Sequence, residues 1–192
     1  MVGNQADLSY YKSFFNFHNT FKTDLVYEKD IKNYLKNIVN GYDVLITTRI
    51  DYDDIIYYDA VNDVRKKIDI NKPIFLHGYN KGYIHFESDF KYYDSDNDFG
   101  DNGVASMFIS LVYYINKLND TYNIYDIGDH SRIKSLFLNI SKSFGIDDIN
   151  YNPFEFENNN PKYIWIRQNY SSFINSSINL RPQFKIIDFN SS

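Results

Sequence analysis

The hydrophobic pattern of the first third of the chain predicts a helix, a strand and a second helix, in that order. Apolar residues recur at helical spacing over residues 27–39, and Gly41 follows where a helix commonly ends. Residues 44–46 (Val-Leu-Ile) have the composition of a strand buried on both faces, which we expect at the centre of a sheet. Residues 55–68 return to helical spacing, and Pro73 interrupts the pattern. This succession predicts an α/β fold.

Strand-like patterns dominate the rest of the chain. Residues 74–76 and 83–86 are short apolar runs that predict paired strands, and the glycine-containing residues 78–82 between them predict a hairpin or a ligand-facing turn. His77 and His85 fall in these strands, where a structural role is expected. The same patterns predict strands over residues 121–127, 163–169 and 184–187 and a helix over residues 131–143.

The acid-rich residues 88–103 predict a solvated loop. Asp94, Asp96 and Asp98 alternate like the oxygen ligands of a calcium loop. Gly100 lies one place later than that motif requires, and no glutamate stands at its closing position. We therefore expect a solvated loop without calcium, suited to act as a lid.

Composition and charge narrow the number of domains, the kinds of partner and the cellular location that we expect for this chain. Its 192 residues are the size of one domain, so we expect residues 1–192 to form a single unit. The net charge of −5 disfavours a nucleic-acid binder that works by general electrostatics. The chain has no cysteine and no apolar run near the roughly 18 residues that span a bilayer. With no signal-peptide pattern either, we expect a cytoplasmic protein without a membrane span.

Three carboxylates follow the strand predicted at residues 44–46. Asp51, Asp53 and Asp54 cannot lie inside a buried strand, so they belong beyond its carboxyl end, where the ligand crevices of open α/β sheets form. The alternate residues Asp51 and Asp53 can converge on one hard cation, Mg²⁺ or Mn²⁺. The alternative is an acidic N-cap and a solvated turn before the next helix.

Residues 47–54, Thr-Thr-Arg-Ile-Asp-Tyr-Asp-Asp, closely resemble the TTRLDxDD core of a rhamnosyl transferase family. Shorter matches to this family are Gly82-Tyr83, Asp129-His130-Ser131 and Trp165-Ile166. The resemblance implies a GT-A-like fold, a mixed sheet flanked by helices. It also implies a metal-dependent glycosyltransferase that moves a sugar from a nucleotide-diphosphate donor to a hydroxyl of a glycan or other acceptor. Rhamnose is suggested by the family name alone.

The resemblance assigns roles to particular residues. Asp51 and Asp53 are expected to hold a divalent cation that bridges the donor's phosphates, with His130 as a candidate third ligand. Arg49 and Arg167 are candidate phosphate contacts because a guanidinium offers a bidentate fork. Asp54 and His130 are both candidates for the general base, and the sequence does not choose between them.

Departures from the family pattern leave a second function open. Tyr113 stands where the family segment often ends in an acidic residue, and Tyr170 stands where a late histidine is expected. Only 50 residues precede the Asp-x-Asp, so either the N-terminal half is compact or the first strand of the fold is missing. The alternative is therefore a degenerate, non-catalytic glycosyltransferase-like binding module. A phosphotransferase of the Asp-x-Asp type is disfavoured, since Ile55 stands where such enzymes carry threonine.

Overall fold

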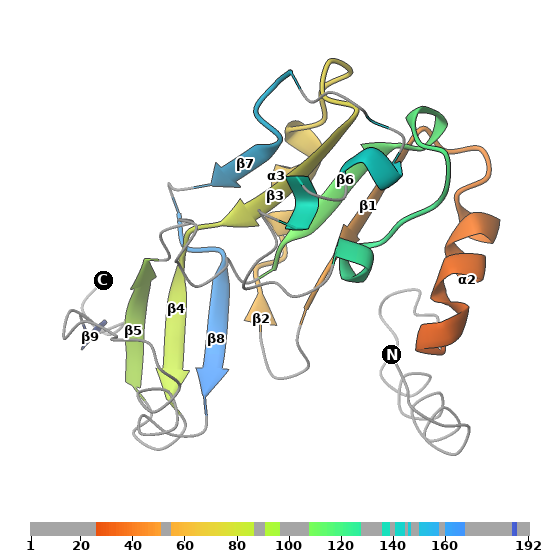
Figure 1. Ribbon diagram of the computed structural model, residues 1–192. Coiled ribbons are helices and arrows are strands. Elements are labelled where there is room, and N and C mark those ends of the chain that lie inside the picture. The colour runs from red at the N-terminus through yellow and green to blue at the C-terminus, as the bar shows by residue number, and fades with distance from the viewer. Residues whose placement is uncertain are drawn as a thin grey trace.

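The protein has a mixed α/β fold with two sheets and several short helices (Figure 1). The computed structural model describes residues 26–50, 55–86, 91–96, 108–127, 136–138, 141–144, 146, 150–157, 160–167 and 186–187. For residues 84, 86, 91–96, 143, 165–167 and 186–187 it describes the backbone alone. The α/β class predicted from the hydrophobic pattern is confirmed.

The first sheet contains β1 (Val44–Thr48), β3 (Ile74–Tyr79), β6 (Ser110–Tyr114) and β7 (Phe154–Glu157). Its strand order is β1-β6-β3-β7. β6 runs antiparallel to β1 and to β3, whereas β3 runs parallel to β7. The carboxyl ends of β1, β3 and β7 therefore meet at one edge of the sheet, the usual place for a ligand crevice.

The second sheet contains β2 (Ile55–Ile56), β4 (Lys81–Phe86), β5 (Lys91–Asp96), β8 (Tyr163–Arg167) and β9 (Ile186–Ile187). Its strand order is β2-β8-β4-β5-β9, with β8 parallel to β4 and the other neighbours antiparallel. Figure 1 shows the chain passing directly from β3 into β4, so one continuous stretch belongs to both sheets.

The hairpin predicted over residues 74–86 is wrong. Gly78 and Tyr79 stay in the ladder opposite Phe156 and Glu157, and Asn80 N–H still donates to the Glu157 carbonyl at 3.1 Å. The chain therefore continues from one sheet into the next instead of turning back. β3 pairs with β6 and β7, which are distant in sequence and which the local pattern cannot identify, whereas β4 pairs with the next strand, β5, and with β8.

The predicted helix over residues 55–68 is shorter than expected. Ile55 and Ile56 form β2, because they pair with Ile164 and Tyr163 of β8. The helix α3 (Ala60–Lys66) begins only after the following turn. Strand pairing at the start of this segment thus overrides its helical spacing.

Two other elements also differ from expectation. Residues 124–127 form the 3-10 helix η3 (Ile124–Ile127) instead of a strand. The Asn123 amide oxygen accepts from Tyr125 N–H at 2.9 Å, and Asp126 accepts from Asn123 N–H at 2.7 Å. These local bonds hold a turn, as Asn and Asp often do. Lys91–Asp96, predicted as part of a loop, is the extended strand β5, which is incompatible with a calcium loop at Asp94 and Asp96.

The remaining helices are short, and the predicted helix over residues 27–39 is confirmed in shortened form. It comprises η1 (Glu28–Asp30) and α2 (Ile31–Ile38), and Gly41 follows with a φ of 85°. That left-handed conformation suits glycine and completes the turn closed by Tyr42 N–H and the Val39 carbonyl. The others are η2 (Ile115–Lys117), η5 (Ser141–Phe144) and a helical turn at residues 136–138, inside the predicted helix 131–143.

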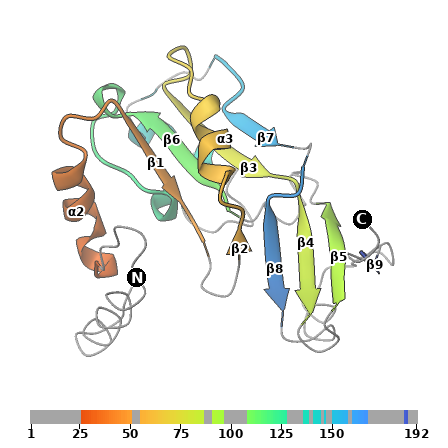
Figure 2. The same ribbon diagram turned by 180° about the vertical axis from the view of Figure 1, so that it is seen from behind.

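Alternation along the strands gives the first sheet two apolar faces. One packs against α3, as Figure 2 shows, through Val64, Phe75 and Val112. The other carries the larger core, formed by Ile74, Leu76, Ile109, Leu111, Tyr113, Ile124, Ile127, Phe137 and Phe144. Among the helices in the described ranges, none has the length and apolarity that a bilayer span requires.

Gly82 of β4 lies against the fully buried ring of Tyr163 in β8. We expect Gly82→Ala to lower the free energy of unfolding by about 1–3 kcal/mol, because the added Cβ would overlap this ring inside a packed sheet. Denaturant unfolding of Gly82→Ala, Tyr163→Leu and the double variant measures the effect. The double variant should recover part of the loss, and strictly additive losses would contradict this packing account.

Candidate functional site

The candidate site lies at the carboxyl end of β1, where Thr48 leads into the predicted acidic segment. Asp51, Asp53 and Asp54 lie outside the described residues, as do Asp129, His130 and Tyr170. The structure instead describes the frame on either side, from β1 before the segment to β2 after it. This frame connects the edge of one sheet to the edge of the other.

β1 differs from its prediction in one respect that affects the site. It was expected to be a central strand buried on both faces, but it is an edge strand in the described sheet and all five of its residues are half-buried. Its apolar composition arises because Val44 and Ile46 pack beside the α3 cluster while Leu45 packs against the larger core. A strand between two apolar layers can thus be rich in Val and Ile while one edge remains unpaired.

The end of β1 is held by contacts to η3 and β6. Arg49 N–H donates to the Ile109 carbonyl at 3.1 Å, and the Thr47 hydroxyl oxygen accepts from Ile124 N–H at 2.9 Å. The Arg49 guanidinium lies over the ring of Tyr125, with its Cζ 5.5 Å from the ring centroid. Arg49 therefore begins the acidic segment from a fixed backbone position, stacked on an aromatic face.

Arg167 is placed by its strand alone. It is the last residue of β8, three positions after Ile164, which pairs with Ile55. Because β2 and β8 are antiparallel, the carboxyl end of β8, with Arg167, lies on the same side of the sheet as the amino end of β2. Arg167 is thus on the side of the second sheet where β2 begins, directly after the acidic segment in the sequence.

A row of polar residues crosses the first sheet near the same edge. Thr48, Ser110, His77 and Glu155 are register partners on successive strands, and paired residues point to the same face of a sheet. The hydroxyl oxygens of Thr48 and Ser110 are 2.7 Å apart and share a hydrogen bond. The sequence did not indicate this row, because its members come together only through the strand order.

His77 is fully buried in this row, which agrees with the structural role predicted for it. Its ring meets that of Tyr79 edge to face, with centroids 4.9 Å apart. Neither ring nitrogen has a hydrogen-bond partner among the described residues. Burial, with a smaller contribution from Lys67, lowers the pKa of His77 to about 4, against the opposing effect of Glu157. The imidazole is therefore neutral at pH 7.

Ion pairs fasten α3 over this face. Lys162 Nζ lies 2.7 Å from Asp59 Oδ2 and 2.7 Å from Asp63 Oδ2. Hydrogen bonding to Asp59 and then to Asp63 raises the pKa of Lys162, and Lys162 in turn lowers the pKa of Asp63. Lys67 pairs with Glu157 at 3.7 Å. These contacts join α3 to β8 and β7 and so hold the two sheets together at the site.

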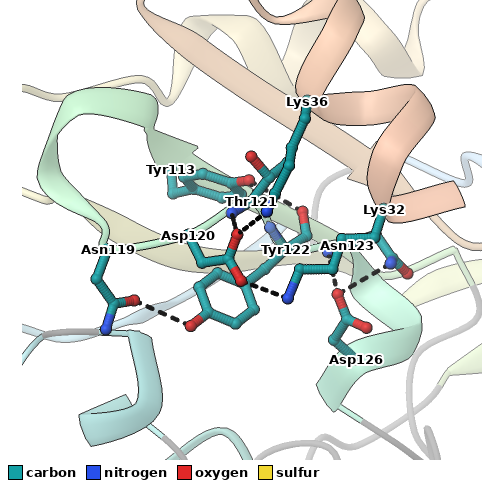
Figure 3. A network of polar contacts seen from close by, with 9 residues as sticks. All are labelled: Lys32, Lys36, Tyr113, Asn119, Asp120, Thr121, Tyr122, Asn123 and Asp126. Atoms are coloured by element: carbon teal, nitrogen blue, oxygen red, sulfur yellow. Dashed lines mark hydrogen bonds and ion pairs between the residues drawn. The ribbon is translucent and has the colours of Figure 1, made fainter.

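A second polar network, drawn in Figure 3, positions the segment that carries Tyr125. Asp120 pairs with Lys32 and, at 2.9 Å, with Lys36, both from α2. These ion pairs, that with Lys32 foremost, hold the pKa of Asp120 well below its usual range. Asn123 bonds in turn to Asp126 at 2.9 Å, and α2 is thus tied to the segment that leads into η3. It thereby supports the turn on which Arg49 stacks.

Tyr113 belongs to the same network and faces away from the α3 side. It is buried, its hydroxyl donates to the Tyr122 carbonyl at 3.0 Å, and its oxygen accepts from Tyr122 N–H at 2.8 Å. Burial raises its pKa to about 12, so the phenol stays neutral. Tyr113, which stands where the resembling family segment often has an acidic residue, is thus a core side chain in this chain.

The described residues alone do not form a metal site. Within those ranges no three His, Asp or Glu side chains gather closely enough to hold a metal ion. A cation at this edge would depend on Asp51 and Asp53. Arg49 and Thr48 precede them at the end of β1, and the Thr48 hydroxyl is already bonded to Ser110. Comparison with protein-family models, curated proteins and solved structures finds no match to this chain.

Proposed function

We propose that the chain is a metal-dependent glycosyltransferase domain with a GT-A-like sheet, acting on a nucleotide-diphosphate sugar. The observation that carries the proposal is the Thr47–Asp54 sequence, which begins at the end of β1, at the edge where β3 and β7 also end. Ligand crevices of α/β sheets form at such edges. Rhamnose as the transferred sugar rests on the family resemblance alone.

The candidate residues have distinct roles in the proposal. Asp51 and Asp53 bind the cation, with His130 as a third ligand, and Arg49 and Arg167 contact the donor's phosphates. When bound there, Mn²⁺ or Mg²⁺ would supply stabilisation of the negative charge on the departing nucleoside diphosphate. Asp54, or His130 where it does not bind the cation, accepts the proton of the attacking acceptor hydroxyl. Stacking of Arg49 on Tyr125 supports its role, since it restricts where the guanidinium can lie.

Donor binding tests the proposal directly. Titration calorimetry of the chain with Mn²⁺ and a panel of nucleoside-diphosphate sugars should show cation-dependent binding of at least one donor. Asp51→Asn should lose that binding, because the amide keeps the shape of the side chain but not its charge. Asp43→Asn changes an exposed carboxylate before the other end of β1 and serves as the matched control.

The second candidate is a degenerate, non-catalytic binding module of the same fold. The observation that favours it is Tyr113, whose buried hydroxyl is committed to Tyr122 and cannot replace an acidic side chain. This candidate predicts that no donor binds in the presence or absence of Mn²⁺. The same titration therefore separates the two functions.

A further inference from the structure

Four large apolar side chains are exposed directly after the acidic segment. The exposed fractions are 49% for Ile55, 37% for Tyr57, 93% for Tyr58 and 61% for Val61. Ile55 is in β2, Val61 is in α3, and the two tyrosines lie in the short connection between these elements, which follow one another in Figure 2. We call Ile55, Tyr57, Tyr58 and Val61 the tyrosine patch. Single exposed apolar residues are ordinary, but four exposed within seven positions are a concentration that needs an explanation.

The chain's richness in tyrosine does not by itself explain this exposure. Tyr79, close to the same helix, is fully buried, and its hydroxyl donates to the Ala60 carbonyl at 2.7 Å. The core-facing positions of α3 are Ala60 and Val64, four apart on one side of the helix. Val61 is therefore off the buried stripe, and Tyr58 lies one turn before it. The core beneath α3 is filled without them.

Two lysines beside the patch are already paired with carboxylates. The Lys162 carbonyl accepts from Tyr57 N–H at 2.9 Å, so this lysine lies next to the patch. Its ammonium is held between Asp59 and Asp63 at 2.7 Å from each, and is thus already neutralised. Lys66 is likewise paired with Asp63, at 3.2 Å. A phosphate or an anionic membrane surface would have to compete with these carboxylates.

The patch is too small to hold two copies of the chain together. A fully exposed aromatic side chain offers about 200 Å². Even with partial contributions from the other three residues, the patch falls short of the roughly 800 Å² per partner of a stable interface. Aromatic rings can instead pack against the apolar face of a sugar ring, while phenol hydroxyls bond to sugar hydroxyls.

We propose that the tyrosine patch binds a neutral oligosaccharide, with sugar rings stacked on Tyr58 and Tyr57. Resting on the proposed function, we identify this oligosaccharide as the acceptor of the transferred sugar. Tyr58 is four residues from Asp54, so their Cα atoms are at most about 14 Å apart along the chain. A sugar chain seated on the patch therefore extends within reach of the acidic segment.

Saturation-transfer NMR, without cation or donor, tests the patch by itself. The probes are maltohexaose, cellohexaose and methyl α-rhamnoside, and we expect at least one to bind. Tyr58→Ala should weaken that binding tenfold or more, since it removes the most exposed ring. Tyr42→Ala is the matched control, because Tyr42 is 69% exposed in the turn between α2 and β1. Failure of all three probes to bind, or equal loss in both variants, overturns the inference.

Two comparisons separate this inference from the proposed function. If a probe binds through Tyr58 but no nucleotide sugar binds, the patch stands and the transferase proposal fails. If transfer occurs and Tyr58→Ala leaves the KM for the acceptor unchanged, the patch is not the acceptor site and the inference fails. Sedimentation of the wild type and Tyr58→Ala completes the test, since self-association that Tyr58→Ala abolishes would assign the patch to a second copy and overturn the inference.

Discussion

Asp51→Asn and Asp53→Asn are each expected to reduce metal-dependent sugar transfer about a thousandfold or more, with the fold intact. In the proposed site each substitution removes one of the two charges that would hold the cation, and with it the stabilisation of charge on the leaving diphosphate. Release of nucleoside diphosphate in the presence of Mn²⁺ and an acceptor measures this effect. Circular dichroism and thermal unfolding establish that the variants are folded.

The control for this prediction is Asp43→Asn, which should retain wild-type turnover and metal dependence. Asp43 precedes β1 and is exposed at the end opposite Thr48, so it matches the charge change without touching the site. Full activity in both Asp51→Asn and Asp53→Asn would remove the basis of the transferase proposal. A folded wild type that binds no donor would instead support the binding module.

The second large effect concerns stability and arises from His77. The pKa of His77 is about 4 in the folded chain, against about 6.5 for an exposed imidazole. Between these values the unfolded state binds more protons, so the stability present above pH 6.5 is lost as the pH falls towards 4. The lowering corresponds to about 3 kcal/mol of unfolding free energy. Urea unfolding at a series of pH values measures this loss.

His77→Leu should remove this part of the pH dependence and stabilise the chain at pH 7 by about 1–3 kcal/mol. The gain is expected because both ring nitrogens are buried without a hydrogen-bond partner in the described part of the chain, and leucine has no polar group to desolvate. His85→Leu, a change in β4 of the second sheet, should keep the pH-dependent loss assigned to His77. An unaltered pH profile in His77→Leu would show that this histidine is not its source.

Local pattern was sufficient where an element depends on its own neighbours in sequence. The helix ending before Gly41, the strand around Val44 and the strand beginning at Tyr163 were predicted close to their observed bounds. Helical spacing and a positive φ at glycine are properties of a few consecutive residues. The burial of His77 in a strand was predictable for the same reason.

What the sequence determined by itself is the class of the fold, the position of β1 and the types of residue that follow it. The tertiary structure decided the rest. It placed β1 at a sheet edge, drew Ile55 and Ile56 into a strand, and carried β3 straight into β4. It also aligned Thr48, Ser110 and His77 in one row and left Tyr58 exposed while burying Tyr79. The reason is that strand pairing and burial depend on partners far away in the chain, which no local periodicity encodes.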